Sequence, residues 1–460
     1  MQVADSLLDL VGNTPLVRLG RVGAHLSCDL IAKVELLNPG GSVKDRPAVA
    51  MIDAAERDGL LQPGGVIVEP TSGNTGVGLA IVAAQRGYSC IFVMSDKMSN
   101  EKVSLLRAYG AEVVVCPTAV PPEHPDSYYS VADRLTRETP GAFRPDQYSN
   151  PANPIEHERS TGPEIWEQTA GRVTHFVAGI GTGGTITGVG RALKARNPKV
   201  QIVGADPEGS VYSGGTGRPY LTEGVGEDFW PTTYDPSIVD RVVMVSDAEA
   251  FAAARRVTQQ EGLLIGGSCG TAVHAALVVA EELGPDDVVV VLLPDSGRNY
   301  LSKIFDDEWM TRYGFLRSPG GEGGVTAGDV LAAKDGSIPE LVVITDDVSA
   351  RDAFARMREL GVSQLIVSVS TEPPLAAKEI SGMVSELPLM DKAFVDGAAL
   401  DRPVRDVMEP APPMVGVGET VSDVVERLER CAAVLVLDGG HPVGILTRAD
   451  VLTFLAARTA

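Results

Sequence analysis

The sequence lacks the features that would indicate secretion, a membrane span or a metal centre. Its cysteines are few and scattered, with no CxxC pair among Cys28, Cys90, Cys116, Cys269 and Cys431. This pattern argues against a disulfide framework and against a zinc site. No apolar stretch reaches the roughly 18 residues that span a bilayer, and no basic region followed by an apolar run opens the chain. We therefore expect a cytoplasmic protein that binds no metal.

Positive charge is also scarce. The chain has 39 lysines and arginines against 61 aspartates and glutamates, a net charge of −22. Such a surface repels phosphate backbones, so a nucleic-acid partner is not expected. Any phosphate-binding site must therefore depend on local donors, such as backbone N–H groups at the start of a helix.

From about residue 30 to 310, short apolar runs alternate with helical stretches, which is typical of α/β folds. Several of these runs are continuous and rich in β-branched residues, as in parallel strands that are covered on both faces. The predicted strands are 66–69, 90–95, 112–116, 175–180, 201–205, 242–246 and 287–293.

The pattern changes after a Gly-rich segment at 316–324, which we interpret as a linker. Beyond it, four short segments of the chain recur in the same order, which indicates two similar units. The matching pairs are 329–331 with 406–408, 348–360 with 421–430, 365–370 with 434–439, and 380–385 with 442–447. We expect two small domains, about 325–390 and 400–460, with a cleft between them.

Lys44 lies in PGGSVKDR (39–46), just before a predicted helix. The positive field at a helix N-terminus favours the neutral form of a lysine amine, and the neutral form is what Schiff-base chemistry requires. A solvated surface lysine that precedes a helix is the alternative interpretation.

Three glycine-rich loops each connect an apolar segment to a helix: TSGNTG (71–76), GIGTGGT (179–185) and GLLIGGSCG (262–270). Backbone N–H groups in such loops bind carboxylates or phosphates, although simple tight turns are also possible. The second loop contains GxGxxG, and Asp206 follows about 20 residues later, so a dinucleotide site is an alternative. No residues suited to hydride transfer accompany it, which weakens that alternative.

Taken together, PGGSVKDR, TSGNTG, DQY (146–148), GTGGT, EGVG (223–226) and GGSCG resemble, in order and spacing, the fold-type II pyridoxal-phosphate enzymes. The repeated tail resembles a pair of CBS domains. The resemblance implies an α/β catalytic domain over 1–315 with two parallel-sheet subdomains, the smaller one at about 44–145 and inserted in the larger. The linker 316–324 and an α+β CBS pair at 325–460 would follow.

The resemblance also implies roles for individual residues. Lys44 would bind pyridoxal 5′-phosphate covalently and act as the catalytic base, with Ser72 and Tyr148 as further catalytic residues. The other cofactor-binding residues would be Asn74, Gly181, Thr182, Gly183, Gly184, Thr185 and Ser268. The substrate would be held by Thr71, Ser72, Thr75, Gln147 and Gly224. Glu227 stands where some relatives have tyrosine, which leaves recognition of the second substrate open.

The implied reaction is a β-replacement of transsulfuration, in which a lyase condenses L-serine with L-homocysteine to L-cystathionine. A serine at the pyridine nitrogen would favour elimination and replacement over transamination. One alternative is cysteine synthesis from O-acetylserine and sulfide. The other is a non-catalytic sensor of an adenosyl ligand, against which an intact Lys44 argues.

In the tail, Thr447 and Asp450 match the ribose-binding pattern of CBS domains, whereas the first copy lacks the acid after Ser385. Together with Gln364, these two residues would bind S-adenosylmethionine or an adenine nucleotide, although a structural dimerisation module is the alternative. The resemblance further implies a homo-oligomer, a dimer or a tetramer. No haem is expected, because the loop that contains His25 and Cys28 does not match the haem-binding context of some relatives.

Overall fold

The computed structural model describes residues 3–71, 73–95, 98, 100–117, 124–318, 324–334, 336 and 341–459. The chain forms two compact units. The first comprises Met1–Gly217 and Thr222–Leu301, and the second comprises Arg218–Leu221 and Ser302–Ala460. Among the described residues, no helix is both long enough and apolar enough to cross a membrane.

A six-stranded sheet forms the larger part of the first unit, and its strands are parallel except for the antiparallel pair β1–β2. The central strand β10 is buried at every position, as its continuous run of valine and leucine predicts. In spatial order the strands are β1 (Leu16–Arg18), β2 (Asp29–Val34), β10 (Val288–Leu293), β7 (His175–Gly179), β8 (Gln201–Pro207) and β9 (Arg241–Val245).

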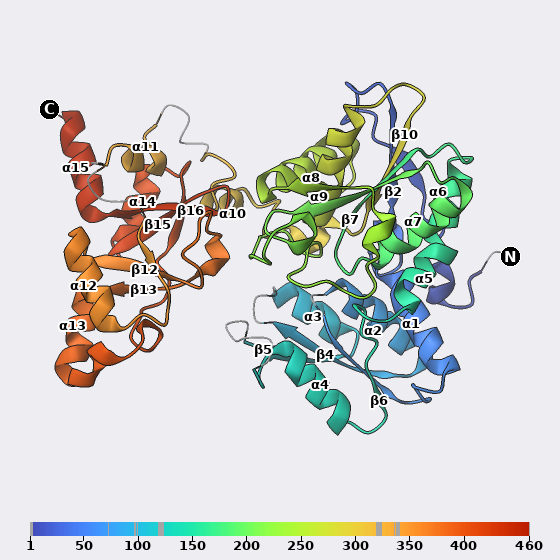
Figure 1. Ribbon diagram of the computed structural model, residues 1–460, viewed down its shortest axis with the longest axis horizontal. Coiled ribbons are helices and arrows are strands. Elements are labelled where there is room, and N and C mark those ends of the chain that lie inside the picture. The colour runs from blue at the N-terminus through green and yellow to red at the C-terminus, as the bar shows by residue number, and fades with distance from the viewer. Residues whose placement is uncertain are drawn as a thin grey trace. The chain divides into compact units, whose positions relative to one another are not determined.

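Helices cover both faces of this sheet (Figure 1). On one face lie α5 (Ala152–Arg159), α6 (Thr161–Gln168) and α7 (Gly184–Arg196), and on the other lie α8 (Asp247–Glu261) and α9 (Gly267–Ala280). The buried side chains of Phe176, Ile202 and Leu292 belong to the core under the first group of helices.

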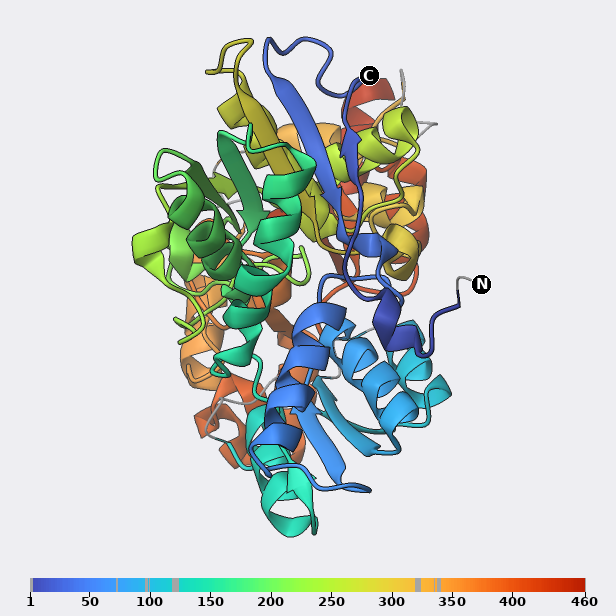
Figure 2. The same ribbon diagram turned by 90° about the vertical axis from the view of Figure 1, so that its right-hand side faces the viewer.

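A second, four-stranded sheet forms the smaller part of the first unit. All its strand pairs are parallel, and Figure 2 shows its blue and cyan strands with the helices packed beside them. In spatial order the strands are β5 (Glu112–Cys116), β4 (Ser89–Ser95), β3 (Val66–Pro70) and β6 (Ala142–Phe143). The helices of this part are α1 (Asp45–Arg57), α2 (Asn74–Arg86), α3 (Asn100–Ala108) and α4 (Tyr128–Glu138).

The predicted fold class is confirmed, and each predicted strand is present to within two residues at either end. Three described strands of the first unit were missed. The strands β1 and β6 have only three and two residues. In β2, Lys33 interrupts the apolar pattern, and its fully buried amine donates to Thr14 O at 2.6 Å and to Glu164 Oε2 at 2.6 Å.

The second unit contains two small sheets of the same design. In each sheet, a parallel pair of strands is followed by an antiparallel pair. The first sheet contains β11 (Val343–Ile344), β12 (Gln364–Ser368) and β13 (Ile380–Ser385). The second contains β14 (Met414–Gly416), β15 (Ala433–Asp438) and β16 (His441–Thr447). The helices are α10 (Asp307–Arg312), α11 (Ala327–Ala332), α12 (Ala350–Leu360), α13 (Glu386–Val395), α14 (Val421–Leu428) and α15 (Arg448–Thr459). This architecture agrees with the repeat read in the sequence.

The boundary between the two units falls after Leu301, earlier than the predicted linker at 316–324. The reason is that the backbone beyond α10 pairs within the second unit. Tyr313 O accepts from Gly440 N at 2.8 Å, and Ser318 N donates to Gly418 O at 3.0 Å. Residues 319–323 of the predicted linker lie outside the described residues, and the domain limits stay predictions.

Candidate active site

A cavity in the first unit opens where strands of the large sheet end. Its lining combines the residues that follow β7 and β10 with the loop before α1 and the turn that begins α9. The lining residues are Val43, Lys44, Gly179, Gly181, Thr182, Gly183, Thr185, Ile186, Gly224, Val225, Ser268, Leu292 and Pro294. Seven of the predicted site residues therefore face one space, at the carboxyl ends of parallel strands where ligands of α/β folds bind.

Lys44 is the N-cap residue of α1. Its backbone is fixed on the N-terminal side, because Val43 N donates to Pro294 O at 2.7 Å. Burial lowers the pKa of the Lys44 ammonium, although the carboxyl groups of Asp295 and Glu227 oppose that shift. The sequence predicted a neutral amine from the field of the helix, and the structure adds desolvation as the main cause.

The loop between β7 and α7 has the close packing expected of a phosphate-binding turn. Gly183 adopts φ 78°, and a Cβ at this position would lie 2.3 Å from the Cβ of Tyr234. At Gly184 a Cβ would lie 2.1 Å from Asn153 Oδ1. Larger residues are therefore excluded at both positions, and the backbone N–H groups at the start of α7 stay accessible to an anion.

Two residues of α5, one turn apart, contact the threonine hydroxyl groups of this loop. Asn153 Nδ2 donates to Thr182 Oγ1 at 3.2 Å, and His157 Nε2 lies 3.2 Å from Thr185 Oγ1. Burial lowers the pKa of His157 well below its ordinary value, so its imidazole is neutral. Both contacts orient hydroxyl groups that the sequence predicts to bind the phosphate.

The predicted carboxylate site forms where β3 meets α2. Thr71 Oγ1 accepts from Gly73 N at 3.1 Å and from Gly76 N at 3.2 Å, and Thr75 Oγ1 donates to Gln147 Oε1 at 2.6 Å. Thr71, Thr75 and Gln147 are therefore brought together. Ser72 lies outside the described residues.

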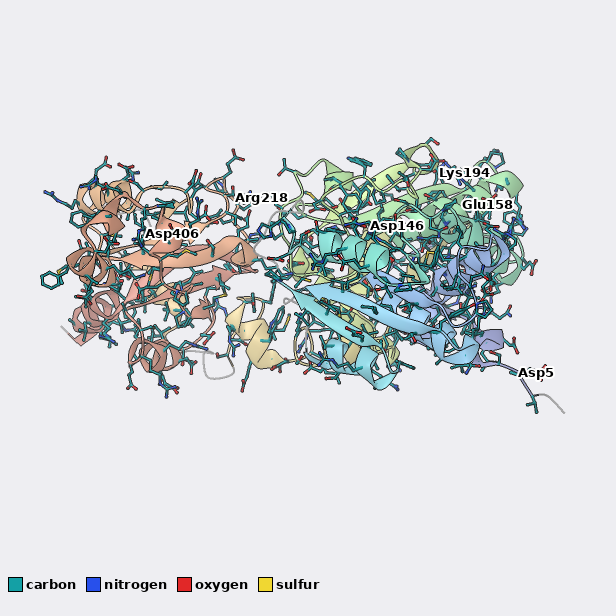
Figure 3. The ribbon with its side chains drawn as sticks, turned by 90° about the horizontal axis from the view of Figure 1, so that it is seen from below. Asp5, Asp146, Glu158, Lys194, Arg218 and Asp406 are labelled. Carbon is teal, nitrogen blue, oxygen red and sulfur yellow. The ribbon has the colours of Figure 1, made fainter. Side chains whose placement is uncertain are left out.

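Gln147 is held in place by a buried carboxyl group. Glu69 accepts from Asp146 N at 3.0 Å and from Gln147 N at 3.1 Å, and Asp146, labelled in Figure 3, has φ 51°. Burial raises the pKa of Glu69 to about 7. This side chain therefore positions the loop that carries Gln147 and Tyr148.

Ser268 lines the cavity from the first turn of α9, whereas Asn74, at the start of α2, does not belong to the lining. Asn74 Nδ2 donates to Asp295 Oδ2 at 2.8 Å, and Tyr300 donates to the same oxygen at 2.7 Å. Ser268 is buried in the first turn of α9, and a Cβ at Gly224 would lie 3.9 Å from its hydroxyl. The EGVG loop thus lies beside Ser268.

Tyr148 lies beside the residues that follow Gly224. Its ring meets that of Phe229 edge-on with the ring centroids 5.3 Å apart, and its hydroxyl group lowers the pKa of Glu227. Burial raises the pKa of Glu227 to about 8, while the nearby Lys44 amine lowers it.

Sequence reasoning did not assign four supporting residues, Glu69, Asn153, His157 and Asp295, and it left the role of Glu227 open. Glu69 and Asp295 stand at or just after strand ends, a position that could have singled them out. Asn153 and His157 are spaced four residues apart on α5, but only the fold brings that helix to the phosphate loop.

The predicted tail residues lie in the second unit. Thr447 and Asp450 form a capping box at the start of α15, in which Asp450 Oδ2 accepts from Thr447 N at 2.7 Å and from Thr447 Oγ1 at 2.6 Å. Lys334 Nζ lies 3.3 Å from Asp450 Oδ1. Gln364 opens β12, in the other small sheet, where it pairs with Ser385. Among these three residues, all in the part of the chain that the structure describes, a hydrogen bond joins only Thr447 and Asp450.

Comparison with known proteins decides the family. Residues 7–295 match the family described as "Pyridoxal-phosphate dependent enzyme", and residues 404–457 match the CBS domain. This chain belongs to the pyridoxal-phosphate-dependent enzymes. Its cofactor is therefore pyridoxal 5′-phosphate, and the resemblance stated above is confirmed.

Curated relatives of this chain include cystathionine β-synthases. The honeybee cystathionine β-synthase is 37% identical over 99% of this chain and 91% of its own length. The rabbit cystathionine β-synthase is 49% identical over 68% of this chain, but the alignment spans only 59% of the rabbit protein. Among solved structures, O-ureido-L-serine synthase is 40% identical, with a TM-score of 0.63 over 67% of this chain and 99% of that one.

The residues present fit the cofactor on three observations. A shielded lysine with a lowered pKa faces the cavity, two glycines of the β7–α7 loop admit no side chain, and a buried serine hydroxyl lines the same space. In the described residues, no group of three or more His, Cys, Asp or Glu side chains is arranged to hold a metal ion.

Proposed function

We propose that the protein condenses L-serine with L-homocysteine to L-cystathionine by β-replacement. The observation that carries this proposal is the shared cavity of Lys44, the β7–α7 loop and Ser268, next to the cluster of Thr71, Thr75 and Gln147. A lysine amine, an anion-binding loop and a carboxylate site are the three elements that an amino-acid-converting pyridoxal-phosphate enzyme needs. The name cystathionine β-synthase, which these relatives share, supports cystathionine as the product. Serine and homocysteine are the substrates that the family resemblance implies.

Each residue has a proposed task. The bound cofactor supplies an aldehyde for the substrate amine and a ring that withdraws electrons from Cα. Thr71, Thr75 and Gln147 hold the substrate carboxylate. Once released, the Lys44 amine takes the proton from Cα and then donates a proton to the departing hydroxyl oxygen. Asn74 and the β7–α7 loop would hold the cofactor, and Ser268 would face its pyridine nitrogen.

Synthesis of cysteine from O-acetylserine and sulfide is the second candidate. The similarity to O-ureido-L-serine synthase and to a hydrogen sulfide-producing enzyme of Fusobacterium nucleatum, 35% identical with a TM-score of 0.62, favours it as a related chemistry. The near full-length similarity to cystathionine β-synthases favours the first candidate. A non-catalytic sensor is disfavoured, because burial lowers the pKa of Lys44 and so favours the neutral amine that covalent catalysis requires.

We also propose that the second unit binds S-adenosylmethionine or an adenine nucleotide through Thr447 and Asp450, with Gln364 as a further contact. The CBS domain match over 404–457 supports this regulatory role. Assembly into a dimer or a tetramer and a cytoplasmic location, without nucleic acid or membrane, complete the proposal.

Two assays on the purified holoenzyme test the proposed reaction. One supplies serine with homocysteine, the other O-acetylserine with sulfide, and the products are identified by mass spectrometry. A higher kcat/KM with serine and homocysteine is the expected result. Faster turnover of O-acetylserine with sulfide would instead support the second candidate, and no product in either assay would support the sensor.

A further inference from the structure

The backbone at Glu227 is fixed by the loops around the cavity. Glu227 N donates to Ser210 Oγ at 3.0 Å, and its carbonyl oxygen accepts from Val211 N at 3.0 Å. One residue earlier, Gly226 N donates to Ile180 O at 2.7 Å, beside the phosphate-binding loop. These three bonds fix the backbone of Glu227 next to the residues that line the cavity.

The carboxyl group of Glu227 lies near enough to two groups of the site to interact with them electrostatically. The Tyr148 hydroxyl and the Lys44 amine both lower its pKa, and it in turn raises the pKa of Lys44. Two residues before it, Val225 lines the cavity, and so does Gly224. Glu227 is therefore an acidic group near the site that is not needed to hold the carboxylate of the first substrate, which the Thr71–Gln147 cluster would bind.

The two candidate second substrates differ in charge. An aminothiol such as homocysteine carries an α-ammonium group, whereas the nucleophilic form of sulfide is an anion. A carboxylate in a partly shielded site attracts the former and repels the latter, and the low dielectric strengthens both effects. Burial raises the pKa of Glu227 to about 8, and a neighbouring ammonium would lower it again and favour the ionised form.

We propose that Glu227 selects the second substrate by pairing its carboxylate with the α-ammonium group of an aminothiol. This inference rests on the proposed β-replacement and assigns the specificity of its second half. Glu227 acts on binding of the thiol and takes no part in removing the serine α-proton.

The test compares E227Q with the wild-type holoenzyme, using serine and three nucleophiles: homocysteine, 4-mercaptobutyrate and sulfide. 4-Mercaptobutyrate keeps the thiol and the carboxylate of homocysteine but lacks its ammonium group. We expect E227Q to lower the ratio of kcat/KM for homocysteine over 4-mercaptobutyrate at least about tenfold, mainly through a higher KM. The kcat/KM for sulfide should stay the same or rise.

Two controls separate specificity from damage. Exchange of the serine α-proton with deuterated solvent, measured without any thiol, should change less than about twofold in E227Q. D286N removes a charge from an exposed residue just before β10, a strand whose other end lines the cavity, and should leave kcat/KM for all three nucleophiles unaffected. An equal fall in kcat/KM for homocysteine and for 4-mercaptobutyrate, or a loss of α-proton exchange, would overturn the inference.

Failure of the proposed function would look different. It would appear in the wild-type protein, as no cystathionine formed from serine and homocysteine. Failure of the inference appears only in E227Q, against an active wild type.

Discussion

The two units of this protein use polar side chains in opposite ways. In the first unit, buried groups such as Asp295, Glu69 and His157 hold neighbouring groups toward the cavity. In the second unit, the predicted ligand residues Thr447 and Asp450 satisfy one another in a helix cap. A site of the first kind is preorganised, because its polar groups are already buried and oriented when the chain folds. A site of the second kind must exchange an existing bond for each bond to a ligand. The first arrangement is suited to catalysis, and the second would suit the reversible sensing that we propose for the tail.

The largest expected effect follows replacement of the amine at the centre of the first unit. Lys44→Ala removes both the covalent attachment point and the proposed base, so turnover should fall by a factor of at least about 10³. S-Adenosylmethionine affinity of the full chain, measured by titration calorimetry, should stay within about twofold. Lys199→Ala changes an exposed lysine of the same unit and serves as the control. Retained β-replacement in Lys44→Ala would refute the role.

Gly184→Ala tests the packing of the phosphate loop. The added methyl group would meet Asn153 Oδ1, and relieving such overpacking costs about 1–3 kcal/mol. We expect the dissociation constant for pyridoxal 5′-phosphate to rise about tenfold, as measured by cofactor fluorescence on dialysed protein. Gly20→Ala, where a methyl group meets nothing within 4 Å, should bind the cofactor normally. Unchanged affinity in Gly184→Ala would contradict this prediction, because it would show that the loop accommodates the added methyl group.

His157 is expected to make the free energy of unfolding of the first unit depend on pH. Because burial lowers its pKa well below the usual 6.5, the unfolded chain gains a proton below pH 6.5 that the folded chain does not. Its contribution is therefore intact above pH 6.5 and is lost as the pH falls, by about 1.4 kcal/mol per pH unit. Urea unfolding of His157→Gln between pH 6.5 and 5.5 should show a slope shallower by that amount. The exposed His25→Gln should keep the wild-type slope; equal slopes in all three proteins would contradict the assignment.

The smallest effect separates the two roles of Asp450. Asp450→Ala and Asp423→Ala each break a capping box, one at α15 and one at α14. Each should cost about 1 kcal/mol and lower the melting temperature of the tail similarly. Calorimetry should show weaker S-adenosylmethionine binding only in Asp450→Ala, with basal activity unchanged in both. Equal affinities would reduce Thr447 and Asp450 to a helix cap.

Much of the first unit could be predicted because its motifs are local. TSGNTG and GIGTGGT each join a strand to a helix, and a buried parallel strand such as β10 is a continuous apolar run. The supporting residues could not be found this way. Glu69 and Gln147, or His157 and Thr185, are far apart in the chain and meet only through the fold. In the tail, the Thr447–Asp450 spacing fits a helix cap as well as a ribose site, so sequence alone could not separate the two.

The most direct test of the account is reduction of the holoenzyme with borohydride, followed by peptide mass spectrometry. The account predicts a pyridoxyl group on Lys44, in a protein that makes cystathionine from serine and homocysteine before reduction and loses this activity after it. A pyridoxyl group on another lysine, or an active protein that traps none, would contradict it.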